Sequence, residues 1–287
     1  YRLRTASFQP GPRVALLQSN IPQTFRVMTY SIDQTLSIMA DLTRAARANQ
    51  PPPDLIIWPE TSYPIGHVVI DPQIEARVLQ DQARQASPES SAADWIDRRE
   101  QSLALLRRWA GEAGAPMLVG TTSYEFQQGG FRKYNAAILI VPKPENAPIP
   151  SYAKIHLVPF GEYVPLLKTF PWLSVLTPYR GMHIPDLDYP EAPSWIDWNG
   201  TRMAVAICFE DTVPQAVGRL FRDSPEGRPV DILVNMTNDG WFRGSSEHDM
   251  HLAISVFRAV EHRAPIVRAV NTGISALIDG NGVVRET

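Results

Sequence analysis

The sequence predicts a single α/β domain, and three observations lead to that prediction. Short apolar runs typical of strands alternate with segments whose apolar residues recur at helical spacing. Of the 287 residues, 44% are hydrophobic, which is ordinary for a folded protein and excludes a disordered chain. The 26 prolines lie at the joints between the apolar runs and form no repeat. We find no linker that would divide the chain into two domains.

The first half of the chain begins with a predicted strand over 13–18, which a proline ends. Apolar residues at helical spacing predict a helix over 29–49, and a run of three prolines follows it. The unbroken apolar run at 54–58 is typical of a buried strand. The stretch over about 71–99 is rich in Gln, Ala, Ser and charge. We therefore expect a polar surface excursion with little core material there, leading into a helix over 95–112.

The second half of the chain is predicted to be richer in strands. Strand patterns lie on both sides of a long irregular segment, and one long helix follows. The predicted strands cover 117–122, 136–141, 152–155, 202–207, 231–236, 266–270 and 275–278, and the predicted helix covers 247–262. Consecutive strands mixed with helices indicate a layered α/β arrangement.

Charge, hydropathy and cysteine content exclude several classes of protein. The chain has 27 Lys and Arg against 30 Asp and Glu, and a net charge of −3 gives no reason to expect a nucleic-acid partner. No apolar run approaches the ~20 residues that span a bilayer. The single cysteine, Cys208, excludes an intramolecular disulfide and any multi-cysteine metal site. It is either an inert buried thiol or a nucleophile.

No motif calls for a cofactor or a metal. The sequence contains no P-loop, no dinucleotide-binding glycine pattern and no G-x-S-x-G elbow. His248 and His251 lie on one predicted helix but do not form H-E-x-x-H. We therefore expect a solvated helix face at these histidines rather than a zinc site.

Three residues suited to catalysis follow predicted strands: Glu60, Lys154 and Cys208. Sites in α/β sheets form outside the carboxyl ends of strands, so these side chains can converge. Partial burial would raise the pKa of Glu60 toward that of a general base, and Lys154 would place positive charge beside an oxyanion. Helical N–H groups after Cys208 would acidify its thiol. Position alone equally allows a solvated glutamate, a surface lysine and an inert thiol, with Glu210 and Asp211 as helix caps.

Longer motifs surround these three residues. They are LLQSNIPQ at 16–23, IIWPET at 56–61, KIHLVPFGEYVP at 154–165, AICFED at 206–211, NMTNDGWF at 235–242 and FRAVEHRAPIVRAVNTGIS at 257–275. Glutamate, lysine and cysteine in this order, within these motifs, resemble the nitrilase (carbon–nitrogen hydrolase) superfamily and, within it, the apolipoprotein N-acyltransferase branch. The resemblance runs from near residue 13 to the end of the chain, apart from 71–99.

The resemblance implies a nitrilase-like α-β-β-α sandwich with a Glu60–Lys154–Cys208 triad and no cofactor. Glu60 would take the proton of Cys208, and the thiolate would attack an acyl ester. Lys154 and the Phe209 N–H would hold the tetrahedral oxyanion. Glu162 matches a second essential acid of the family and would orient Lys154 or Glu60.

Further positions carry over from the same family. Phe209 and Glu210 match residues that flank the nucleophile, and Trp241 matches an aromatic side chain near the site. In the family the acyl group leaves a phospholipid and forms a thioester with the enzyme. It then passes to the N-terminal amine of a diacylglyceryl-cysteine apolipoprotein, so the kinetics are ping-pong.

An apolar loop over about 156–185 supports a lipid substrate from the residues themselves. It carries Phe160, Tyr163 and Trp172, and a long apolar loop without secondary structure is often an active-site lid. Aromatic side chains suit a membrane–water interface, so we expect these residues to bind substrate. The alternative is a loop packed onto the core of the domain.

The sequence also departs from the family. Val27 stands where the family often has Trp, and Phe209 stands where it often has Tyr. Residues 1–12 resemble the edge of the family's N-terminal transmembrane bundle, and residues 13–287 would form a catalytic domain that ends before the family's final strands. We expect a monomeric domain facing the periplasm at the bacterial inner membrane. The alternatives are a soluble amidase acting on a small amide and a non-catalytic domain that binds lipids or lipoproteins.

Overall fold

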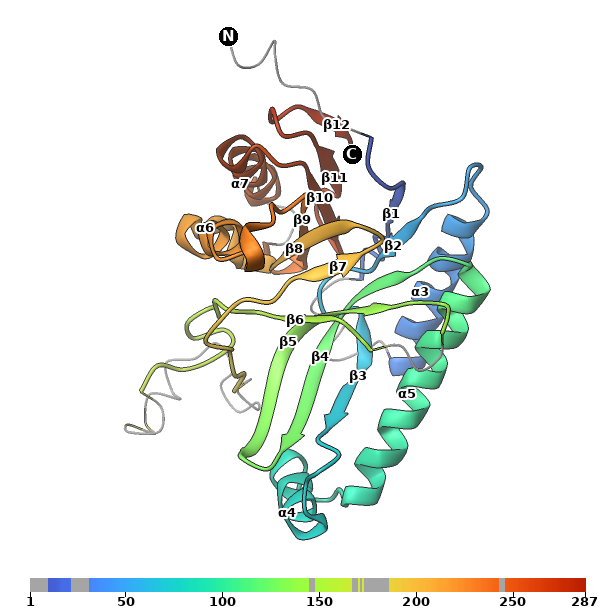
Figure 1. The fold of residues 1–287 in the computed structure, drawn as a ribbon, viewed down its shortest axis with the longest axis vertical. Helices are drawn as coiled ribbons and strands as arrows, with labels where there is room; N and C mark the ends of the chain where they lie inside the picture. Colours follow the sequence, from blue (N-terminus) through green and yellow to red (C-terminus); the bar gives the residue numbers. More distant parts are fainter. Residues whose placement is uncertain are drawn as a thin grey trace.

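The computed structural model describes residues 10–21, 31–144, 148–166, 170, 172, 186–242 and 246–287, without the side chains of 241 and 242. Within these residues two six-stranded sheets lie face to face, and helices cover the outer face of each sheet (Figure 1). This arrangement is an α-β-β-α sandwich, and it confirms the predicted α/β fold class.

The first sheet comes from the first half of the chain, in the strand order β1-β2-β4-β5-β6. Strands β1, β2 and β4 are parallel, whereas β5 and β6 are antiparallel to their neighbours. Strand β2 pairs with the beginning of β4, and β3 pairs with the later part of the same edge of β4. The chain therefore leaves the sheet after β2 and returns to it as β3. The bounds are β1 Val14–Leu16, β2 Leu55–Ile57, β3 Tyr63–Ile70, β4 Met117–Gln127, β5 Gly130–Ile140 and β6 Ser151–Ala153.

The second sheet comes from the second half of the chain, in the order β12-β11-β10-β9-β8-β7. Its three central strands, β8, β9 and β10, are parallel, and antiparallel strands form both edges. The bounds are β7 Ile196–Trp198, β8 Thr201–Ile207, β9 Ile232–Thr237, β10 Ile266–Val270, β11 Ala276–Ile278 and β12 Val284–Glu286.

Helices close both outer faces of the sandwich. The described helices are α3 Ile32–Arg47, α4 Ala76–Ala86 and α5 Ala92–Ala113 beside the first sheet, and α6 Pro214–Arg222 and α7 Glu247–His262 beside the second. Short 3₁₀ turns η2 Cys208–Thr212, η3 Pro225–Gly227 and η4 Asp239–Phe242 follow strands or helices. Capping boxes at Ser31 and Ser91 start α3 and α5, because each serine and the residue three positions later satisfy one another's free N–H groups. No helix in these ranges has the length and apolarity of a membrane span.

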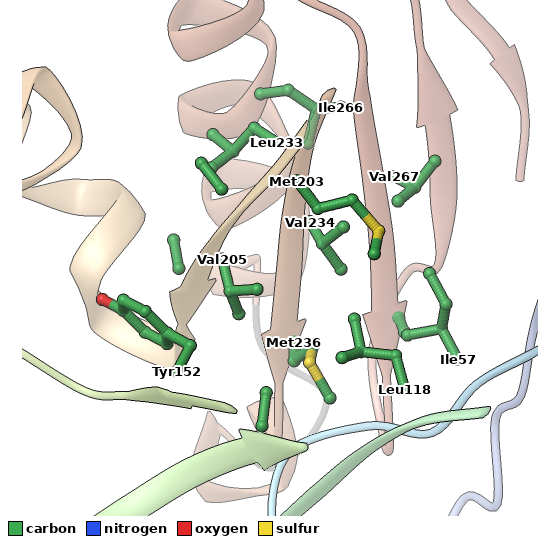
Figure 2. Close-up of a cluster of buried hydrophobic side chains, with 14 of the residues drawn as sticks. Ile57, Leu118, Tyr152, Met203, Val205, Leu233, Val234, Met236, Ile266 and Val267 are labelled. Atoms are coloured by element: carbon green, nitrogen blue, oxygen red, sulfur yellow. The ribbon is translucent and has the colours of Figure 1, made fainter. Parts of the chain in front are cut away.

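Two hydrophobic cores lie on opposite faces of the first sheet. In β2, Leu55 and Ile57 face the second sheet, whereas Ile56 and the following Trp58 face α3 and α5. Between the sheets, Leu118 of β4 lies near the side chains of β9, as Figure 2 shows. Strands buried on both faces read as unbroken apolar runs, which is why the sequence reveals β2 and β8.

The prediction for residues 71–99 was wrong in one respect. This stretch contains α4 and the start of α5, and together with extended ends of β3, β4 and β5 it encloses a third core. Leu79, Trp95 and Phe126 are buried in it. Leu79 and Trp95 fall on the inner faces of α4 and α5 and pack against Phe126 of β4, so a stretch with few apolar residues still contributes to a core.

Candidate active site

Glu60, Lys154 and Cys208 lie at the edge of the sandwich where strands of the two sheets end. Glu60 lies between β2 and β3, Lys154 directly follows β6, and Cys208 directly follows β8. Asn135 donates to Glu60 and to Glu162, and Glu162 pairs with Lys154, so Glu60 and Lys154 lie together. The residues next to Lys154 and Cys208 both donate to the Glu210 carboxylate, which places Cys208 beside them. The structure thus brings together the three residues that the sequence singled out.

Glu60 occupies a break in the first sheet, and Gly120 of β4 makes room for that break. A Cβ atom at Gly120 would lie 2.2 Å from the carbonyl oxygen of Pro59 and 2.8 Å from the Cα atom of Glu60. Only glycine therefore lets the backbone before Glu60 cross so close to β4. The glutamate side chain is turned into the protein and is 7% exposed.

Lys154 is a buried lysine with a carboxylate partner. Its side chain is 1% exposed, and its Nζ atom lies 2.8 Å from each oxygen of Glu162. The Val158 N–H donates to the same carboxylate at 2.8 Å, which fixes Glu162 in place. Burial alone lowers the pKa of Lys154, but the charges of Cys208, Glu60 and Glu162 outweigh it and raise the pKa. Lys154 is therefore a fixed positive charge.

Asn135 of β5 joins the two carboxylates of the site. Its Nδ2 group donates to Glu60 Oε1 at 2.8 Å and to Glu162 Oε1 at 3.1 Å. Its backbone carbonyl accepts from the Lys154 N–H at 2.9 Å. One residue thus holds three members of the site. No motif in the sequence marks Asn135, and its only signal is a polar residue directly before the apolar run that forms the end of β5.

Cys208 lies at a strained turn, with a backbone φ of 55°. Burial and the nearby Glu60 raise the pKa of its thiol, whereas Lys154 and a hydrogen bond with Thr237 lower it. The net shift is upward, because desolvation is the largest of these effects. The thiol is neutral at rest and needs a base.

Glu60 has the properties of that base. Burial raises its pKa, and the charge of Glu162 adds to the effect, while Lys154, Asn135 and the Cys208 thiol oppose it. A glutamate close to a neutral thiol and beside a fixed ammonium group can accept the thiol proton when it is ionised. The ammonium group would then face both the thiolate and any oxyanion formed by its attack.

Glu210 is a buried structural centre, not a simple helix cap. Its carboxylate accepts from the N–H groups of Ile155, His156 and Ile207 at 2.7–2.9 Å and from the Tyr152 hydroxyl at 3.0 Å. Burial raises the pKa of Glu210 to about 7. These bonds tie the segment that carries Lys154 to the strand that carries Cys208, across the two sheets.

The expected aromatic residues lie on the exposed side of the site segment. Phe209, next to Cys208, is 42% exposed, Phe160 is 40% exposed and Trp172 is 64% exposed, whereas Tyr163 is half-buried. The side chain of Trp241 lies outside the described part of the structure. So do residues 167–169, 171 and 173–185 of the expected lid.

His251 contradicts the expectation of a solvated helix face. It is 6% exposed and lies between two carboxylates, with Nε2 2.8 Å from Asp211 Oδ1 and Nδ1 2.9 Å from Asp239 Oδ1. The helical pattern alone could not reveal this, because both partners come from distant turns. In the described ranges, no group of three or more His, Cys, Asp or Glu side chains is arranged to hold a metal ion.

Comparison with known sequences reveals relatives that are longer than this chain. The apolipoprotein N-acyltransferase of Geobacter metallireducens is 33% identical over 273 residues, which are 95% of this chain and 44% of that protein. The apolipoprotein N-acyltransferase of Nitrosomonas europaea is 32% identical over 276 residues, 95% of this chain and 46% of that protein. The chain therefore spans less than half the length of these curated relatives.

Comparison with solved structures reveals the same sandwich. A CN-hydrolase superfamily protein from Xanthomonas campestris matches with a TM-score of 0.58 and 15% identity, over 96% of this chain and 86% of that one. A carbon–nitrogen hydrolase from Helicobacter pylori matches with a TM-score of 0.58 and 12% identity, over 95% of this chain and 82% of that one. At this identity the likeness concerns the fold alone.

The family model described as carbon-nitrogen hydrolase matches residues 13–285, which is nearly the whole chain. The matched residues include both sheets, apart from the last residue of β12, and all three residues at the strand ends. The chain belongs to the carbon–nitrogen hydrolase family.

Proposed function

We propose that this chain transfers an acyl group from a phospholipid to the N-terminal amine of a diacylglyceryl-cysteine apolipoprotein. One observation carries the proposal: buried Glu60 and Lys154 and half-buried Cys208 lie together at the strand ends of a chain 33% identical to a protein named apolipoprotein N-acyltransferase. We assign the catalytic domain to residues 13–287 and the approach to the membrane to residues 1–12.

The first half-reaction forms a thioester. Glu60 takes the proton from the Cys208 thiol, and the sulfur attacks the ester carbonyl of the phospholipid. Lys154 and the Phe209 N–H stabilise the oxyanion of the tetrahedral intermediate. When the intermediate collapses, protonated Glu60 returns the proton to the departing lysophospholipid hydroxyl, and the acyl group remains on sulfur.

The second half-reaction is the mirror of the first. Glu60, again a carboxylate, takes a proton from the incoming amine as its nitrogen attacks the thioester carbonyl. The amide leaves, and the thiol of Cys208 regains the proton. Because the two substrates react one after the other through one covalent intermediate, the kinetics are ping-pong.

Exposed apolar side chains in the segment that follows Lys154 support a lipid surface as the partner. Phe160, Leu166, Phe170 and Trp172 are between 40% and 65% exposed. Large apolar side chains gathered on one short segment are costly in water and are typical of membrane or ligand contact. We therefore place the domain at the membrane surface, on the periplasmic side where lipoproteins mature.

Acyl transfer is tested by incubating the chain with a phospholipid that carries a fluorescent acyl chain and with a synthetic diacylglyceryl-cysteine peptide. We expect labelled peptide with the wild-type chain and none with Cys208→Ala. Release of ammonia from small amides, without labelled peptide, would contradict the proposal and favour an amidase. Reactivity with neither substrate, together with lipid binding, would favour a non-catalytic binding domain.

The oxyanion role of Lys154 has a matched control. We expect Lys154→Ala to lower the acylation rate by about 10²–10³-fold, since removal of one oxyanion donor costs that much in other enzymes. Lys143→Ala removes an exposed lysine after β5 and is expected to leave the rate unchanged. Equal rates for wild-type and Lys154→Ala chains, both folded by circular dichroism, would refute the assignment.

A further inference from the structure

A buried network of charged side chains lies behind the nucleophile, between the second sheet and α7. Its members are Asp211 of η2, Asp239 of η4, His251 and Ser255 of α7, and Arg268 of β10, and each is at most 6% exposed. These residues belong to the sequence motifs at 206–211, 235–242 and 257–275, apart from those of α7. The reaction described above uses none of them.

The network satisfies both of its aspartates with charged donors. His251 bridges Asp211 and Asp239 at 2.8 and 2.9 Å. Arg268 Nη2 donates to Asp239 Oδ2 at 2.6 Å, and its Nη1 lies 3.5 Å from Asp211 Oδ2. Burial lowers the pKa of His251, but its bonds to the two aspartates outweigh burial and raise the pKa to about 9. Two carboxylates, one imidazolium and one guanidinium together carry no net charge, so the network is tolerable in the interior.

Thr237 connects this network to the reacting sulfur. Its Oγ1 atom donates to Asp239 Oδ1 at 2.9 Å. In the parallel pairing of β8 and β9, Ile207 lies opposite Met236, so the next residues, Cys208 and Thr237, lie side by side where the two strands end. At this position the hydroxyl is close enough to lower the pKa of the thiol. A hydroxyl has one proton and can donate to only one of these partners at a time. While the thiol is neutral, its proton faces Glu60 and Thr237 is free to donate to Asp239. Once the thiolate forms, the sulfur becomes the better acceptor.

We propose that Thr237 is a further catalytic residue whose hydroxyl turns from Asp239 to the Cys208 sulfur when the thiolate forms, and that His251 and Arg268 are positioning residues that keep Asp239 hydrogen-bonded during this turn. The proton of Cys208 passes to Glu60, so the turn only redirects an existing O–H and no further proton is needed. The inference rests on the proposed role of Cys208 as nucleophile, but it concerns the thiolate and not the acyl donor.

Alkylation by iodoacetamide tests the proposal without any lipid, because Cys208 is the only cysteine of the chain. At pH 8 the rate follows the small thiolate fraction. We expect Thr237→Val to slow alkylation about tenfold, the effect of one lost hydrogen bond to a charged group. Thr237→Ser keeps the hydroxyl and is expected to stay within about twofold of wild-type, since the same bond forms. Equal rates for Thr237→Val and wild-type would overturn the proposal.

The positioning role of His251 is tested by a double-mutant cycle. Without His251, Asp239 keeps the hydrogen bond from the Thr237 hydroxyl, and the hydroxyl cannot turn to the sulfur. We therefore expect His251→Gln to slow alkylation in the wild-type background and to have no further effect on the rate in the Thr237→Val background. His262→Gln removes another histidine of α7, which stacks on Phe221, and is expected to leave the rate unchanged. Additive effects of the two substitutions would refute the coupling. If His251→Gln does not fold, the Thr237→Val and Thr237→Ser pair still decides the role of the hydroxyl.

Failure of this proposal and failure of the proposed function are distinguishable. If the wild-type chain transfers acyl groups but Thr237→Val is alkylated at the wild-type rate, only the inference about Thr237 is refuted. If Thr237→Val is alkylated more slowly as expected but the wild-type chain transfers no acyl group, the inference stands and the proposed function is refuted.

Discussion

At the scale of single residues, the site depends on neighbours that hold like charges together. Glu60 and Glu162 both approach Lys154, and without a donor between them their repulsion would favour protonation of one carboxyl. Asn135 supplies that donor to both. The hydrogen bond from the amide thus opposes the upward shift of the Glu60 pKa and favours the ionised form that a base needs.

Asn135→Asp is expected to move the acid limb of the pH–rate profile to higher pH by about one unit. Burial already raises the pKa of Glu60, and activity falls when pH drops below that pKa, because protonated Glu60 cannot act as a base. The substitution removes a hydrogen bond that lowers this pKa and adds a negative charge that raises it. The measurement is the acylation rate between pH 5 and 9.

The control for this substitution is Asn49→Asp, which adds the same charge at an exposed position after α3. Its pH profile is expected to match wild-type. An unshifted acid limb in Asn135→Asp would show that Asn135 does not set the ionisation of Glu60.

At the scale of elements, the site forms because Glu60, Lys154 and Cys208 each follow the end of a strand, and these strand ends lie at one edge of the sandwich. The sequence predicts β2 and β8 because each is an unbroken apolar run, and the short strand predicted at 152–155 overlaps β6. It does not predict the return of the chain into β3, because Tyr63–Ile70 contains a proline and a glycine and lacks regular alternation. The roles of Asn135, Thr237 and His251 depend on pairing between distant strands and turns, which no local pattern encodes.

Gly120→Ala tests how the break after β2 positions Glu60. The added Cβ would overlap the Pro59 carbonyl, so we expect a loss of unfolding free energy of about 1–3 kcal/mol and a large fall in acylation rate. Gly111→Ala in α5 meets no atom within 4 Å, and it is expected to raise the unfolding free energy by about 0.5–1 kcal/mol with unchanged rate. Urea unfolding and acylation assays compare the two; equal stability of both variants would refute the close approach.

At the scale of the whole molecule, two sheets bring together residues from both halves of the chain. The first sheet supplies Glu60, Asn135 and Lys154, and the second supplies Cys208 and Thr237. Glu210 joins the halves through hydrogen bonds to segments that follow β6 and precede η2. The fold class followed from the alternation of elements, but the meeting of the two halves did not, since it depends on packing between sheets.

The buried network is expected to make the stability of the whole molecule depend on pH. The pKa of His251 is about 9 in the folded chain, above its ordinary value near 6.5. Its contribution is therefore complete below about pH 6.5 and is lost as pH rises to about 9, with a size of the order of 3 kcal/mol. The difference in unfolding free energy between wild-type and His251→Gln chains, measured in urea, should shrink between pH 6.5 and 9.5. A constant difference would contradict a protonated His251.

The central claim is that Cys208 carries the acyl group, and intact-mass spectrometry of the chain after incubation with phospholipid vesicles tests it most directly. The account predicts an added mass equal to one acyl chain, removed by neutral hydroxylamine, in the wild-type chain. It predicts no such adduct in Cys208→Ala and a strongly reduced one in Glu60→Gln. A hydroxylamine-sensitive adduct that persists in Cys208→Ala, or its absence from a folded wild-type chain, would contradict the account.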